Sequence, residues 1–137
     1  VDPETWVALA QFDYKIEVPT SAPALAGGGG AAVAKARGNE FLVRKRTDGA
    51  SAALAGLVLT GAAIRRVTVA IVDVGTETTT ELGRFTFEDV QVMTIGSAEG
   101  GAHGELPLEE VRFQFGRYTQ TVGGATSGYD FKNNIRR

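Results

Sequence analysis

Apolar and polar residues alternate along four separate stretches of this chain. Between Trp6 and Val18 every even position is apolar or aromatic, and positions 11, 13, 15 and 17 are polar. The same period of two returns in Ile64–Val74 and, with interruptions, in Thr78–Ile95 and Glu105–Val122. Because successive side chains of a β-strand point to opposite faces, this period predicts strands with one buried face. The chain is therefore predicted to be mainly β.

The alternation changes parity within the last two of these stretches. In the third stretch it changes between Phe87 and Val90, which predicts either a β-bulge at Glu88–Asp89 or two short strands. In the fourth it changes near Glu109–Glu110, which predicts a kink there. Neighbouring residues of a strand point to opposite faces, so neither pair of acids is expected to form a catalytic couple. We expect both pairs to be solvated or to belong to bulges.

One segment has the pattern of a helix. Asp48 is a favourable N-cap, the following residues are rich in Ala and Leu, and Leu54, Leu57 and Val58 fall at helical spacing before Gly61. The apolar stripe has no basic flanks on a polar face, which argues against a lipid-binding helix. We therefore expect the helix to dock on the protein's own sheet.

A weaker extended stretch from Ala32 to Arg46 and a closing strand near the C-terminus complete a set of about six predicted strands. Short strands of this kind favour a small antiparallel β-barrel, or a sandwich of two sheets, with the helix at about residues 50–59 on its side. The length of 137 residues suits one core, so a single domain spanning residues 1–137 is expected.

Composition argues against several classes of function. The net charge is −2, and the basic run Arg44–Arg46 is too short to favour nucleic acid. The chain has no Cys and a single His, so thiolate or histidine metal sites, and cofactors held by them, are not expected. No apolar run approaches the roughly 20 residues of a membrane-spanning helix, so we expect no membrane partner.

Two glycine-bearing loops interrupt the strands. The first, from Pro19 to about Ala31, includes Gly27–Gly30, and loops this long usually bind something or stay disordered. No Gly-Lys-Ser/Thr follows these glycines, so a phosphate-binding loop is not indicated. The second loop, Gly96–Gly104, contains His103, for which the sequence offers no orienting residue. An exposed histidine is expected there, and the chain is not expected to be an enzyme.

The C-terminal segment is a glycine-rich turn, Gly123–Gly128, followed by a predicted closing strand. In that strand Tyr129 and Phe131 share one face, and Asp130 shares the other with Lys132. By itself this segment indicates only a hairpin that completes a sheet.

The order of these features resembles the hemolysin co-regulated protein (Hcp) family, which forms the inner tube of the type VI secretion system. Family members carry an aromatic strand, a glycine-rich loop, a strand, an Asp-started Leu-rich helix, further strands and a Tyr/Trp-Asp-x-x-x-Asn tail. The matching segments are Trp6–Val18, Pro19–Gly30, Phe41–Arg46, Asp48–Leu59, Ile64–Ile95, Glu105–Val122 and Tyr129–Asn134. Two features depart from the family pattern. An additional first strand has no counterpart here, and Phe12-Asp13-Tyr14 replaces a Ser-Trp-Gly-like turn.

The resemblance implies a structural subunit that forms hexameric rings, which stack into a conduit or projectile for effector export. Its implied partners are further copies of itself, exported effectors and other parts of the apparatus. It would be made in the bacterial cytoplasm and exported through that apparatus. The implied ring-stacking residues are Pro19, Pro23, Leu25, Gly27, Gly28, Gly29 and Gly30. The implied C-terminal strand contains Gly128, Tyr129, Asp130, Phe131, Asn133 and Asn134.

Other functions remain compatible with the residues. One is the tube protein of a related phage-like contractile system. Another is a monomeric β-sandwich that binds a ligand through its two glycine loops. A small hydrolase that uses His103 and nearby acids is the least favoured.

Overall fold

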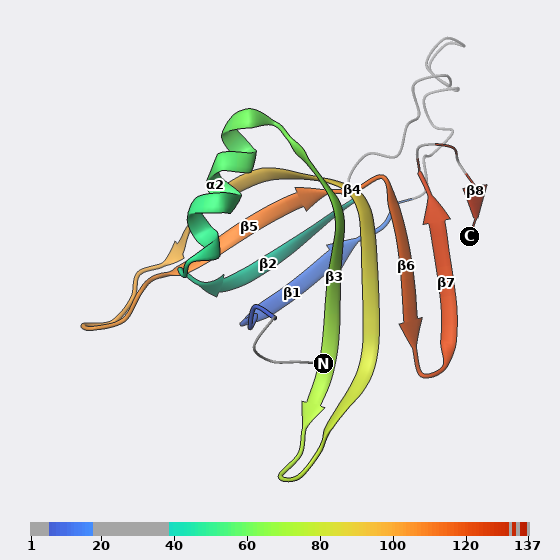
Figure 1. Ribbon diagram of the computed structural model, residues 1–137, viewed down its shortest axis with the longest axis horizontal. Coiled ribbons are helices and arrows are strands. Elements are labelled where there is room, and N and C mark those ends of the chain that lie inside the picture. Colours follow the sequence, from blue (N-terminus) through green and yellow to red (C-terminus); the bar gives the residue numbers. More distant parts are fainter. Residues whose placement is uncertain (1–5, 18–38, 132, 134, 137) are drawn as a thin grey trace.

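A single antiparallel sheet and one helix make up the part of the chain that the computed structural model describes, residues 6–17, 39–131, 133 and 135–136 (Figure 1). The elements are β1 (Gln11–Lys15), β2 (Glu40–Arg46), α2 (Ala50–Thr60), β3 (Ala63–Val74), β4 (Thr79–Glu99), β5 (Leu108–Gln114), β6 (Arg117–Val122), β7 (Ala125–Asp130) and β8 (Ile135–Arg136). The prediction of a mainly β fold with one helix is confirmed.

Strand β4 is the longest strand and organises the sheet. One of its edges pairs with β3, and its other edge pairs first with β6 and then with β5. The register passes from Glu88↔Arg117 to Gln91↔Gln114 without a shift, so β5 and β6 form one line that is interrupted only at Phe115–Gly116. The full order is β1-β2-β5-β4-β6-β7-β8, with β3 beside β4.

The sheet curls until its two halves share one core. Strand β1 lies three places from β4 in the strand order, yet the Phe12 and Phe85 rings are 5.3 Å apart and those of Tyr14 and Phe85 4.8 Å. Between the halves lies one cluster of buried side chains: Phe41, Val43, Val69, Phe85, Phe87, Val90, Val92, Val111, Phe113 and Phe115. The predicted two sheets are thus two halves of one curled sheet.

The curl is centred on the parity change in β4. Asp89 has a φ of +54°, a left-handed conformation that is uncommon for a residue with a side chain. It re-aims the strand, so that Phe87 before it and Val90 after it are both fully buried. The parity change lies at the predicted position, but the pairing of β4 with its neighbours has no register shift there, so Asp89 redirects the strand without a β-bulge. Strand β4 continues as one strand instead of splitting into two.

The second predicted kink was wrong. Glu109 does not mark a kink, because it lies on the same inward face of β5 as Val111 and Phe113 and is only 6% exposed. The interruption lies instead at Gly116, whose N–H donates to the carbonyl of Glu88 at 3.0 Å. Alternation of apolar residues could not reveal a carboxylate that occupies a core position.

The buried Glu109 is paired with a buried lysine of the neighbouring strand. Lys45 is 2% exposed, and its Nζ lies 2.5 Å from Glu109 Oε1 and 2.7 Å from Asp48 Oδ1. Ser51, in the first turn of α2, donates to the same Glu109 oxygen at 2.6 Å. The cluster therefore joins β2, β5 and the helix. The reading of both glutamates as solvated is corrected for Glu109, while Glu110 is half-buried and lies 3.8 Å from Arg44.

Helix α2 begins and ends as the sequence predicts. The N–H of Ala50 donates to Asp48 Oδ1 at 3.0 Å, although Gly49 is the residue that directly precedes the helix. Gly61 takes a φ of +71° and donates to the carbonyl of Leu57, which satisfies a terminal carbonyl. Three apolar side chains, Leu54, Leu57 and Val58, pack against the core. The helix is thus docked on the sheet.

Several predicted boundaries were wrong. The first strand is shorter than expected, the second begins only at Glu40, and residues 32–38 lie outside the described part. Strand β4 continues to Glu99, so the second loop covers residues 100–107. The terminal turn has only two residues, Gly123 and Gly124, with φ of +59° and +82°. Positive φ at both positions is typical of a tight hairpin, so β7 starts earlier than predicted.

Replacing Lys45 by Met tests the buried pair. The change leaves the Glu109 carboxylate buried without its cation, so we expect a loss of about 3–5 kcal/mol in the free energy of unfolding. Adding Glu109→Leu removes the unpaired charge, so the double variant should recover most of the lost free energy of unfolding. Urea unfolding of the three proteins measures both effects. A single variant as stable as the wild type would contradict the pairing.

Acid titration of Asp48→Asn tests the charge at the start of the helix. The hydrogen bond from Lys45 lowers the pKa of Asp48 below its ordinary 3.8; burial opposes this, and the Ala50 N–H adds to it. A lowered pKa stabilises the fold at pH values above the ordinary one, and the stabilisation is lost as the pH falls through the folded pKa. Asn keeps the capping oxygen, so the variant should lose about 1 kcal/mol at pH 7. In thermal unfolding this difference should vanish near pH 2; a constant difference would contradict the account.

Candidate functional site

The described residues adjoining the first glycine loop are held together by one buried asparagine. Asn39, directly before β2, is 4% exposed and accepts the N–H of Glu17 through Oδ1 at 2.9 Å. Its carbonyl accepts the N–H of Phe115 at 3.3 Å. Glu17 and Asn39 are the last and first described residues on either side of the loop. They are therefore adjacent to each other and to the interruption between β5 and β6. The seven predicted loop residues lie outside the described residues: Pro19, Pro23, Leu25, Gly27, Gly28, Gly29 and Gly30.

The C-terminal segment attaches at the same interruption. The N–H of Phe131 donates to the carbonyl of Gly116 at 2.8 Å. The Phe131 ring lies 5.9 Å from that of Phe115 and 4.7 Å from that of Tyr129. Phe115 and Gly116 are consecutive, so the base of the loop and the tail are fixed at one place. Sequence reasoning missed this role, for which the aromatic–glycine pair between two strands is the only signal.

The polar residues of the tail form a local turn. Asp130 is 5% exposed, and its carboxylate accepts the backbone N–H of Asn133 at 3.1 Å and its side-chain amide at 3.0 Å. Gly128 is buried in β7, directly before Tyr129. Asn134 lies outside the described residues. These bonds end β7 and turn the chain toward β8. Asp130 and Asn133 therefore have a structural role in this turn.

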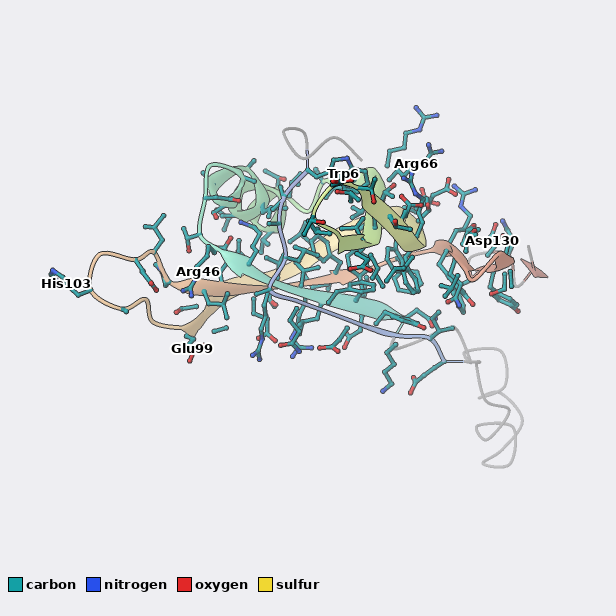
Figure 2. All side chains as sticks on the ribbon, turned by 90° about the horizontal axis from the view of Figure 1, so that it is seen from below. Trp6, Arg46, Arg66, Glu99, His103 and Asp130 are labelled. Carbon is teal, nitrogen blue, oxygen red and sulfur yellow. The ribbon has the colours of Figure 1, made fainter. Side chains whose placement is uncertain are left out.

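The residues considered for catalysis do not come together. His103 projects from the loop after β4 at one end of the molecule, while Asp130 lies at the other end (Figure 2). Arg117 lies 2.9 Å from Asp89 and 3.8 Å from Glu88, so these acids face a cation. Within residues 6–17, 39–131, 133 and 135–136, no three His, Cys, Asp or Glu side chains are grouped as metal ligands.

The outward face of β2 and β5 carries a charged network. Arg112 lies 3.4 Å from Glu110 and 3.6 Å from Glu40, and Glu110 also lies 3.8 Å from Arg44. Each of these side chains is at least one quarter exposed, so each pair contributes little to stability. This face is therefore a solvated polar surface.

Three of the described strands, β1, β3 and β8, have an unpaired edge. In the part of the chain that the structure describes, β1 pairs only with β2, β3 only with β4, and β8 only with β7. The free edge of β3 is 12 residues long, carries no Pro or Lys, and is mostly apolar from Val67 to Val72. Free backbone groups on a long regular edge are a template for pairing with another chain. Among the described helices, none is long and apolar enough to cross a membrane.

Comparison with solved structures shows the same fold in Hcp proteins. Hcp1 from Salmonella typhimurium has 20% identity and a TM-score of 0.76, and the match covers 96% of this chain and 84% of that chain. A type VI secretion system effector from Yersinia pestis has 21% identity and a TM-score of 0.68, covering 90% and 83%. The secreted protein Hcp3 from Pseudomonas aeruginosa has 17% identity and a TM-score of 0.67, covering 91% and 74%.

Among curated protein sequences no match was found. At the level of families, the profile described as "Type VI secretion system effector, Hcp" matches residues 2–122. That range runs from before β1 to the end of β6 and contains the loop, the helix and the curl of the sheet. The chain therefore belongs to the Hcp family of type VI secretion system proteins.

Proposed function

We propose that the chain is a structural subunit of a type VI secretion inner tube, in which hexameric rings stack into a conduit or projectile. The observation that carries this proposal is the free edge of β3, together with membership of the Hcp family. A subunit that leaves such an edge unpaired risks uncontrolled aggregation. A closed ring of identical subunits covers the edge at every contact.

The first glycine loop is proposed as the element that stacks one ring on the next. Asn39 holds the two flanks of this loop together, so the residues between them start and end at one fixed place. Gly27–Gly30 have no side chains, and their conformation would be set by the neighbouring ring. Ordering them costs conformational entropy, so stacking should be weaker than ring formation.

The tube would act by its shape and not by chemistry. Among the described residues, Asp48 and Glu109 both contact Lys45, and Glu88 and Asp89 both contact Arg117, so these acids are paired with cations. The energy for injection would come from the surrounding machinery. The proposed partners are further copies of the chain, exported effectors and other parts of the apparatus. Export through that apparatus from the bacterial cytoplasm is part of the same proposal.

Negative-stain electron microscopy of the purified protein tests ring and tube formation separately. The wild type should show rings of uniform diameter, and at high concentration short stacks. Deleting Gly27–Gly30 should leave the rings intact and remove the stacks, because the proposed role of the loop is to contact the next ring and not the neighbour within a ring. A strictly monomeric wild type would contradict the proposed function. Loss of the rings on deletion would show that the loop belongs to the ring contact instead.

A further inference from the structure

The exposed side chains of helix α2 are apolar except for Thr60 at its end. Its 11 residues include no charged side chain, and none of them is buried within the subunit. Leu54 and Val58 face the core, whereas Ala52 and Ala53 are exposed and Leu59 is 86% exposed. A helix that is apolar nearly all round is normally buried. The described residues cover this helix on one side only.

A glycine inside the helix strengthens this point. Gly56 lies on the outer side, and a Cβ built there would have no atom within 4 Å. The described residues therefore give no packing reason for glycine, which costs about 1 kcal/mol relative to Ala in a helix. Small residues at Ala52, Ala53 and Gly56 beside the projecting Leu59 make a shallow apolar surface. We call these four residues the helix patch.

A second exposed apolar surface lies at the far ends of β3, β4 and β6. Ile71 and Val122 are paired with Gly83 from its two sides, and the Val122 side chain lies against Gly83. Asp73, two residues after Ile71, shares the same face of β3. The exposed fractions are 41% for Ile71 and 46% for Val122. We call Ile71 and Val122 the hairpin patch.

The two patches cannot cover each other within one subunit. Helix α2 leads into the start of β3, and the hairpin patch lies near the other end of β3 (Figure 1). A strand of 12 residues spans roughly 40 Å. A contact between the patches must therefore join two copies of the chain.

The charges beside the patches are complementary. Arg65 and Arg66 follow the helix at the start of β3, and Arg66 points away from the molecule (Figure 2). Asp73 and Glu77 flank the β3–β4 turn and are exposed. The structure records no ion pair for any of these four side chains in the part of the chain that it describes. A basic margin beside one patch can thus meet an acidic margin beside the other.

From these surfaces we infer that the helix patch of one copy docks on the hairpin patch of the next copy around the ring. The inference rests on the proposed ring and names its contact. Because the two patches differ, the contact is head-to-tail, and repetition of a head-to-tail contact closes into a ring when the rotation fits. Leu59 is the central apolar anchor, and the arginines and acids set the orientation.

Two single substitutions test the contact from its two sides. Leu59→Asp and Val122→Asp each place a charge on a side chain that is exposed in the subunit, to 86% and 46%, so folding should be unaffected. Light scattering should show loss of the ring for each variant at concentrations where the wild type is assembled. Leu106→Asp, at another exposed leucine (59%) outside both patches, is the matched control and should keep the ring. Circular dichroism checks that all variants remain folded.

Mixing the two variants distinguishes the head-to-tail contact from other arrangements. The Leu59→Asp protein keeps its hairpin patch and the Val122→Asp protein keeps its helix patch, so an equal mixture should form a dimer through one intact contact. A dimer of Val122→Asp alone would show helix-to-helix pairing and overturn the inference. Rings that persist in both variants would overturn it while leaving the proposed function standing. A wild type that stays monomeric would overturn both.

Discussion

The structure depends on the place where its sheet curls. Asp89 re-aims β4, and opposite it the line of β5 and β6 breaks at Phe115–Gly116. Curling brings Phe12 of an outlying strand against Phe85 and encloses the aromatic core. The loop base at Asn39 and the tail at Phe131 are hydrogen-bonded to the two residues of that break. One backbone feature thus positions the core and both segments that the family resemblance singles out.

The buried Lys45–Glu109 pair serves a different purpose from the aromatic core. Burial alone lowers the pKa of Lys45, but its hydrogen bonds to Asp48 and Glu109 outweigh this, and the pKa is raised. The lysine therefore stays charged and fixes the first turn of α2 to β2 and β5. Such a pair adds little net stability over apolar residues, yet it specifies one position for the helix. That position leaves the helix patch facing outward.

The alternation of apolar and polar residues in strands and the residues at the two ends of the helix predicted much of the fold. The surface proposed for assembly could not be predicted in this way. The parity change between Phe87 and Val90 located the change of direction in β4, and Asp48 with Gly61 located the helix. Glu109 was misread because a charged residue at a core position looks like a surface residue in any polar–apolar pattern. The helix patch was equally hidden, since its apolar residues satisfied the expectation of docking on the sheet. The exposure of Ala52, Ala53 and, at 86%, Leu59 shows that one side of the helix has no partner among the described residues.

The central claim is that assembly covers the outer side of α2, and the accessibility of position 59 tests it most directly. The chain has no cysteine, so Leu59→Cys introduces a unique thiol whose labelling rate can be followed by mass spectrometry. The account predicts slow labelling in the assembled protein and rapid labelling after dissociation, with Leu106→Cys rapid in both states. Equally rapid labelling at position 59 in the intact assembly would contradict the account.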